Sequence, residues 1–164
     1  MLLLRWPRFL KNFNLWVGLG AMGKRRASRE LALKFLYQFE LNGGDLDEQM
    51  KLFFERNSSR EDVKIFMKDL VVSLLDKVKE IDEIIQKFSD HWVLDRMAVI
   101  DRNILRMGTC ELLFGFSTPP KVVINEAIDI AKKYGNEDSP EFINGILDKV
   151  YKEIRQKGPL PFTT

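Results

Sequence analysis

Apolar residues recur every three or four positions through most of the chain after residue 28, with charged residues between them. In the first such segment Leu31, Phe35 and Phe39 form one stripe, and Gly43-Gly44 follows it. This period, with Gly or Pro at the segment ends, is typical of amphipathic helices. The same period covers residues 46–57, 59–88, 97–115, 119–135 and 139–157. Since no segment reads convincingly as a strand, the pattern predicts an all-α bundle of six to seven helices.

The number of helices depends on residues 59–88, where the apolar period continues without a Gly or Pro. This segment is compatible with one long helix or with two helices joined at a bend near Asp76.

The first predicted helix carries apolar residues on two faces. At about 100° per residue, Leu33, Tyr37 and Leu41 lie nearly opposite the stripe that contains Phe35. Two interpretations remain open. The helix lies centrally and buries both faces, or the second face binds a partner protein through Tyr37, because buried aromatics commonly dominate such contacts.

Positive charge is concentrated at the beginning of the chain. Residues 1–34 contain eight Lys or Arg against one acid, Glu30, a net charge of +7, whereas the whole chain carries +2. Four of these cations, Lys24, Arg25, Arg26 and Arg29, occur together at the start of the first helix. Cations oppose the dipole at a helix N-terminus, so the cluster indicates a separate benefit such as binding a polyanion.

Residues 1–22 differ from the rest, with many apolar and aromatic residues, no acids and no helical period. Their cations, among them Arg5 and Arg8, lie inside the apolar stretch, which argues against a signal peptide. We expect an N-terminal extension with little fixed structure. Residues 18–23 match G-x-G-x-x-G, but no strand precedes them, so we attribute the match to chance and expect no cofactor.

Several kinds of chemistry lack the residues that they need. One cysteine, Cys110, and one histidine, His91, cannot build a disulfide or a zinc finger, and neither belongs to a recognisable catalytic group. The longest uncharged run, residues 12–23, is shorter than the roughly 20 residues of a membrane-spanning helix. These features predict a cytoplasmic protein that is neither an enzyme nor a metalloprotein.

Several motifs resemble one family in a fixed order. They are RRASR over residues 25–29 with Leu36-Tyr37, DRNILR over 101–106 with Glu111-Leu112, VINEAIDIAKKYG over 123–135 and SPEFINGILD over 139–148. Together they resemble the NusB family of transcription antitermination proteins over about residues 23–155. Several motifs in order are more specific than any one alone.

The resemblance implies a fold and a function. It implies one domain over residues 23–158, with two three-helix subdomains at about 23–76 and 77–158, followed by a tail at 159–164. It also implies binding of single-stranded boxA RNA together with the ribosomal protein NusE, within a complex that assists ribosomal RNA transcription.

The resemblance also implies residue roles. The RNA side comprises Lys24, Arg25, Arg26, Arg29, Lys121, Asp138 and Phe142. The NusE side comprises Tyr37, Leu41, Asp95 and Asp101, and the two-faced first helix adds Leu33. One departure is Ala27, where relatives often have an arginine, which predicts weaker phosphate contacts.

The residue types suit these roles. Guanidinium groups pair with phosphates and stack on bases, so we expect Arg25, Arg26 and Arg29 to line a groove for a single strand. Phe142, near the start of the last helix, can stack on a base, while the acid Asp138 opposes the RNA by repulsion. By contrast, we expect Asp101 to form a surface salt-bridge cluster with its neighbours.

Two other functions fit the same sequence. One is a helical protein-interaction module without RNA affinity, in which the basic cluster is incidental. The other is a stand-alone RNA-binding domain of the type that some ribosomal RNA methyltransferases carry ahead of their catalytic domain.

Overall fold

The computed structural model describes residues 21–115 and 117–157, and within them it contains seven α-helices and one short 3-10 helix. These are α1 (Ala21–Asn42), α2 (Leu46–Arg56), α3 (Glu61–Asp76), α4 (Val78–Phe88), η2 (Leu94–Arg96), α5 (Val99–Phe114), α6 (Pro120–Tyr134) and α7 (Ser139–Lys157). No strand occurs in the described residues. The prediction of an all-α fold is confirmed.

Some predictions fall on residues outside the described part of the chain. They concern the N-terminal extension up to residue 20, including the first two glycines of the G-x-G-x-x-G match, and the tail at 159–164. Gly23, the last glycine of that match, lies inside α1.

Local sequence explains where the first helices end. Gly43 and Gly44 have φ angles of 63° and 98°, a region that side-chain-bearing residues rarely adopt, so α1 stops there. The Asp45 carboxylate then accepts a hydrogen bond of 2.9 Å from the Glu48 N–H and caps α2. Lys77 (φ −111°, ψ 15°) interrupts the long apolar segment, so α3 and α4 are separate helices. Of the two alternatives for residues 59–88, two helices joined near Asp76 is therefore correct.

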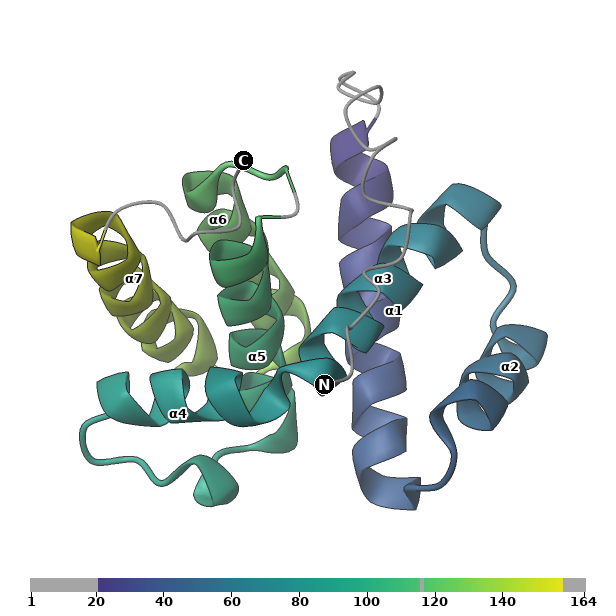
Figure 1. Ribbon diagram of the computed structural model, residues 1–164, viewed down its shortest axis with the longest axis horizontal. Coiled ribbons are helices and arrows are strands. Elements are labelled where there is room, and N and C mark those ends of the chain that lie inside the picture. The colour runs from purple at the N-terminus through teal and green to yellow at the C-terminus, as the bar shows by residue number, and fades with distance from the viewer. Residues whose placement is uncertain (1–20, 116, 158–164) are drawn as a thin grey trace, which may run out of the picture.

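The helices form two groups that share one core. Figure 1 shows α3 crossing α1 with α2 outside them, and α5, α6 and α7 standing together with α4 across one end. Helix α5 contacts α1 and α3 as well as α6 and α7, and the buried side chains of both groups form one cluster. α5 and α7 approach closely, because a Cβ on Gly108 would lie 2.9 Å from a Leu147 methyl carbon. The division into two subdomains stays a prediction.

Candidate functional site

The first turns of α1 lie against α5 and α6, and this contact determines what the predicted RNA-binding arginines can do. Arg29 is only 4% exposed. Its Nε and Nη2 donate hydrogen bonds of 2.6 and 2.7 Å to the two carboxylate oxygens of Glu111 on α5. The expectation that Arg29 lines an open groove is wrong, because a buried guanidinium needs a partner inside the fold and Glu111 is that partner.

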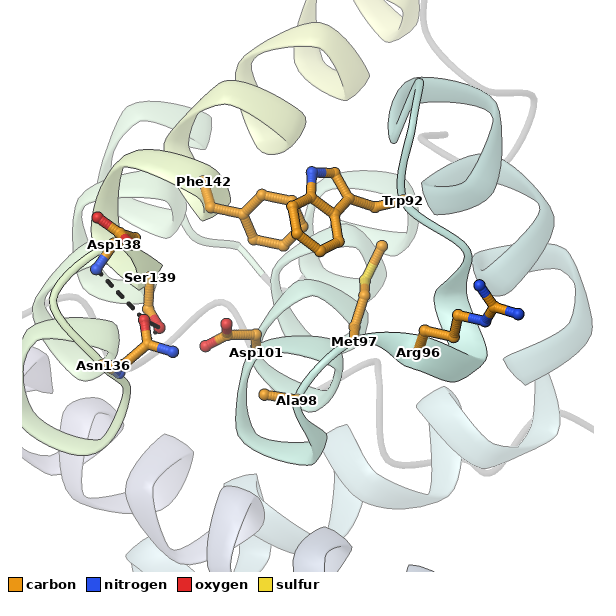
Figure 2. A pocket seen from close by; sticks show the side chains of 9 residues that line it. All are labelled: Trp92, Arg96, Met97, Ala98, Asp101, Asn136, Asp138, Ser139 and Phe142. Atoms are coloured by element: carbon orange, nitrogen blue, oxygen red, sulfur yellow. Dashed lines mark hydrogen bonds between the residues drawn. The ribbon is translucent and has the colours of Figure 1, made fainter.

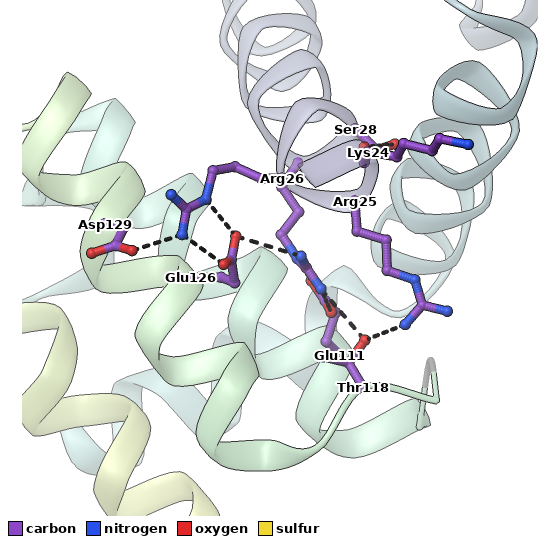
Figure 3. Close-up of polar contacts among 9 residues, drawn as sticks. Lys24, Arg25, Arg26, Ser28, Glu111, Thr118, Glu126 and Asp129 are labelled. Atoms are coloured by element: carbon purple, nitrogen blue, oxygen red, sulfur yellow. Dashed lines mark hydrogen bonds and ion pairs between the residues drawn. The ribbon is translucent and has the colours of Figure 1, made fainter. Parts of the chain in front are cut away.

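Arg26 is also paired, but nearer the surface. Its Nε and Nη2 donate to both carboxylate oxygens of Glu126 at 2.9 and 2.7 Å, and Nη2 donates to Asp129 at 2.7 Å. Figure 3 shows this fork on α6. The hydrogen bonds to Glu126 raise the pKa of Arg26 above its usual range. An RNA phosphate would have to compete with these carboxylates.

Arg25 has a different environment. Its Nη1 donates to the Thr118 hydroxyl at 3.0 Å (Figure 3). Its guanidinium carbon also lies 5.4 Å from the centre of the Phe66 ring. Burial, followed by repulsion from Arg29, lowers the pKa of Arg25. An approaching phosphate would offset the repulsion from Arg29 and favour the charged guanidinium.

Two lysines complete this end of the molecule. The Lys24 Nζ lies 3.0 Å from an Asp62 carboxylate oxygen, and their hydrogen bond lowers the pKa of Asp62. Lys121 is exposed in the first turn of α6, three residues after the Thr118 that contacts Arg25. We call Lys24, Arg25, Arg26, Arg29 and Lys121 the arginine end, together with Glu111 of α5 and Glu126 and Asp129 of α6.

A second feature is a cavity of about 220 Å³ beside the starts of α5 and α7. Its lining residues are Trp92, Arg96, Met97, Ala98, Asp101, Asn136, Asp138, Ser139 and Phe142. They are drawn in Figure 2. The cavity brings Asp101, predicted to bind the partner protein, together with Asp138 and Phe142, predicted to bind RNA.

The cavity has aromatic walls and an unsatisfied acid. The Trp92 and Phe142 ring centres lie 6.0 Å apart at an interplanar angle of 73°. Asp101 is only 8% exposed, and its buried Oδ1 has no hydrogen-bond partner among the described residues. The expected surface salt-bridge cluster is therefore wrong for Asp101.

The arginines near Asp101 in the sequence turn to other helices. Arg102 pairs with Glu40 of α1, and Arg106 donates to Asp82 of α4 at 2.7 Å. Because the two arginines face other elements, Asp101 faces the cavity without them. These ion pairs connect α5 to α1 and α4 and are structural.

The residues predicted for the partner protein do not share one environment. Leu33 is 2% exposed and belongs to the core, because α1 packs on both α3 and α5. The prediction that Leu33 lies on an exposed stripe is wrong. Tyr37 and Leu41, further along α1, are exposed, with Leu41 at 62%, and Asp95 is exposed in η2.

Sequence reasoning missed several residues that define these sites. The sequence pattern did not single out Trp92, although it is 57% exposed and lines the cavity. The signal available in the sequence was its position a few residues after the predicted helical segment 59–88. Nothing in the sequence singled out Glu126 and Asp129 as partners of Arg26, because they lie about a hundred residues away from it.

Other candidate chemistry is absent from the described residues or inaccessible. Cys110 is fully buried, and burial raises the pKa of its thiol. Residues 21–115 and 117–157 hold no group of three or more His, Cys, Asp or Glu side chains able to bind a metal ion. None of the helices in this part of the chain has the length and apolar character that crossing a bilayer requires.

Comparisons with known proteins identify the family. The model of the NusB family matches residues 26–152. The transcription antitermination protein NusB of Thermodesulfovibrio yellowstonii is 43% identical over 140 residues, which cover 79% of this chain and 93% of that protein.

Solved structures agree with the sequence comparison. T. maritima NusB is 37% identical with a TM-score of 0.72, covering 79% of this chain and 91% of that chain. A chain in the crystal structure of antitermination factors NusB and NusE in complex with dsRNA is 35% identical with a TM-score of 0.72, covering 80% of this chain and 98% of its own. The chain therefore belongs to the NusB family.

Proposed function

We propose that this protein is a transcription antitermination factor that binds single-stranded boxA RNA together with NusE and assists ribosomal RNA transcription in the cytoplasm. Family membership supports the general role, and a related NusB occurs in a structure with NusE and dsRNA. The observation that carries the joint role is the cavity, because residues predicted for RNA (Phe142, Asp138) and for the partner (Asp101) line it together.

In this proposal the arginine end contacts the RNA backbone. Arg25 gains most from a phosphate, Arg26 exchanges part of its carboxylate contacts for one, and Lys121 extends the positive surface onto α6. Arg29 holds α1 in place from behind through Glu111. Phe142 offers a ring to an unpaired base.

The test is fluorescence anisotropy with labelled boxA RNA over a salt series, with and without NusE. A scrambled strand of equal composition and a duplex of the same sequence serve as controls. We expect boxA to bind more tightly than both, with a logarithmic salt slope of roughly 0.7 per neutralised phosphate. Lys121→Ala should lower that slope, whereas Lys51→Ala, an exposed lysine on the distant α2, should leave it unchanged.

The partner contact has its own test. Tyr37 is half-exposed on α1, and an aromatic anchor commonly contributes about 2 kcal/mol to binding, or roughly thirtyfold in Kd. We expect Tyr37→Ala to weaken NusE binding by this factor in calorimetry. Val72→Ala, which shortens a similarly exposed apolar side chain on α3, is the control. Binding of NusE without any RNA affinity would favour the protein-interaction module instead.

A further inference from the structure

The outer side of α3 combines exposed apolar residues with acids. The buried residues of this helix, among them Leu70 and Leu74, pack into the core. On the opposite side Ile65 and Val72 are 39% and 41% exposed. Seven residues apart on a helix, they lie on one line along its surface. Aliphatic side chains in such a row are more stable when something covers them.

Two acids lie beside these apolar residues. At about 100° per residue, Asp69 and Asp76 fall on the same side of α3 as Ile65 and Val72, and we call these four residues the α3 face. Neither acid has an ion pair in residues 21–115 and 117–157. Burial raises the pKa of Asp69, and the neighbouring Lys68 offsets this only in part. A cation from elsewhere would favour the ionised carboxylate.

The chain itself contains a segment of matching character. Residues 1–20 hold three cations, Arg5, Arg8 and Lys11, and no acid. Between these cations lie tryptophan, phenylalanine and leucine side chains. The expectation of little fixed structure there rests on the absence of a helical period within the segment. A surface with acids beside aliphatic side chains supplies what the segment lacks, because it can bind both the cations and the apolar groups.

The segment joins the fold next to the start of α3. The Lys24 Nζ lies 3.0 Å from an Asp62 carboxylate oxygen, and the Ser28 hydroxyl donates to the Val63 carbonyl at 2.9 Å. The α3 face is about 16 Å long, since each helical residue advances by about 1.5 Å. Residues 1–20 reach up to about 70 Å when extended. They therefore reach the whole face, and the covalent link gives them an effective concentration of roughly millimolar.

The spacing of the charges also agrees. Pro7 favours an extended backbone, in which three residues advance about 9 Å, and Arg5 and Arg8 are three residues apart. Asp69 and Asp76 are seven helical residues apart, which is about 10 Å. The two arginines would therefore meet the two acids at once.

From these observations we propose that residues 2–11 dock on the α3 face of the same chain. Arg5 and Arg8 pair with the two acids, and the aromatic side chains between and beside them cover Ile65 and Val72. This contact goes beyond the binding of RNA and NusE, because the α3 face contains none of the residues assigned to either.

Trp6 reports the docking in the full chain. The chain has three tryptophans, so Trp16→Phe and Trp92→Phe leave Trp6 alone. Its fluorescence is then measured with increasing acrylamide, which quenches an exposed indole more than a covered one. We expect the quenching constant of Trp6 to be clearly lower in the folded chain than in the same chain in urea.

Reversing the charge of the α3 face should release Trp6. We expect Asp69→Lys with Asp76→Lys to raise its quenching constant about twofold, because attraction to the arginines becomes repulsion. Glu48→Lys with Glu55→Lys is the matched control, since these acids are exposed on α2 with the same spacing of seven residues. The control should leave the quenching constant unchanged.

A charge swap tests for direct contact. Arg5→Glu with Arg8→Glu should also release Trp6, and these substitutions leave the helices of the fold untouched. Combining them with Asp69→Lys and Asp76→Lys should restore the low quenching constant. Restoration identifies pairing between the two sets of charges, because independent effects would add instead. Urea unfolding checks that each variant retains the fold.

Three results would overturn the proposal. The first is a quenching constant of Trp6 that is the same in every folded variant. The second is a charge swap that restores nothing, which would mean that the α3 face is not the site. The third is protection of Trp6 that increases with protein concentration, which would place the segment on a second copy of the chain.

Discussion

The arginine end and the cavity differ in whether the fold supplies partners for their charged groups. At the arginine end, Arg29 and Arg26 bind carboxylates of α5 and α6, and the Arg29–Glu111 pair is buried. At the cavity, the buried Asp101 Oδ1 has no described partner, and a large aromatic side chain, Trp92, is exposed. The region with the most charge is thus largely satisfied by the fold, while the less charged region is not.

This difference changes what each region indicates about ligand binding. A cluster of cations indicates a polyanion only to the extent that its charges are available, and here two of the arginines are already committed. An unsatisfied buried group beside an exposed aromatic is the more specific sign of a ligand, because the fold gains nothing from it alone. We therefore expect affinity for the RNA backbone to come mainly from the arginine end.

The largest expected effect tests whether Arg29 is structural. Glu111→Gln would leave the buried guanidinium without its carboxylate, and breaking such a pair commonly costs about 3 to 5 kcal/mol. We expect the free energy of unfolding in urea to fall by about this amount. A loss below about 1 kcal/mol would mean that Arg29 does not depend on Glu111, and the contrast between the regions would weaken.

A matched double substitution separates lost charge from lost packing. Replacing both partners, Arg29→Met with Glu111→Leu, removes the buried charges while keeping apolar volume, and such replacements are often neutral or stabilising. The double variant should recover most of the stability that Glu111→Gln loses. If stability is not recovered, the neighbouring Glu126, which lies 3.8 Å from Arg29, also depends on the Arg29 charge.

The next effect concerns RNA affinity within the arginine end. Arg25→Ala should weaken RNA binding about tenfold and reduce the salt slope by roughly 0.7, the value of one phosphate contact. Arg26→Ala should weaken it less, because Arg26 must give up carboxylate contacts to bind a phosphate. The measurement is anisotropy over a salt series, with urea unfolding as a check because Glu126 loses a partner. Equal losses for both variants would contradict the contrast between them.

Much of the fold was predictable from the sequence, because helical periodicity and Gly or Pro boundaries are local signals. The break at Lys77 was only one of two alternatives, since its backbone angles depend on how α3 and α4 pack. The cation cluster was also visible in the sequence, but the ion pairs that its arginines form were not. The partners of Arg26 and Arg29 lie 82 to 103 residues away, and only the tertiary fold brings them together.

The same reason explains Leu33 and Asp101. Both stripes of α1 were visible, but whether Leu33 is buried depends on how many helices surround α1. The spacing of Asp101 and its neighbouring arginines suggested a local cluster, yet Arg102 and Arg106 face α1 and α4 instead. Sequence spacing defines which face of a helix a residue occupies, and tertiary packing defines what that face meets.

A smaller effect tests whether carboxylates restrain Arg26. Asp129 is partly exposed and contributes one of the contacts to Arg26, and a surface pair of this kind is worth about 0.2 to 1 kcal/mol. Asp129→Asn should therefore tighten RNA binding by up to about fivefold, because Glu126 alone then competes with the phosphate. Asp148→Asn, which removes a similarly exposed acid paired with Lys152 on α7, is the control and should have less effect. If RNA affinity is unchanged in Asp129→Asn, the carboxylate partners of Arg26 do not reduce its binding to a phosphate.

The smallest effect concerns the acid at the cavity mouth. Asp138 is exposed, and no ion pair involves it among the described residues, so its charge acts on RNA only as repulsion. Asp138→Asn should tighten binding by about twofold at low salt, and the gain should vanish as added salt screens the charge. Glu137→Gln, which neutralises the neighbouring exposed acid outside the cavity lining, should have a smaller effect. Equal gains from both substitutions would show a general field effect, whereas a gain confined to Asp138→Asn would place the strand at the cavity. A weaker affinity in Asp138→Asn would mean that this carboxylate itself accepts a hydrogen bond from the RNA. The cavity would then contain two acids that bind a ligand, Asp101 and Asp138, instead of one.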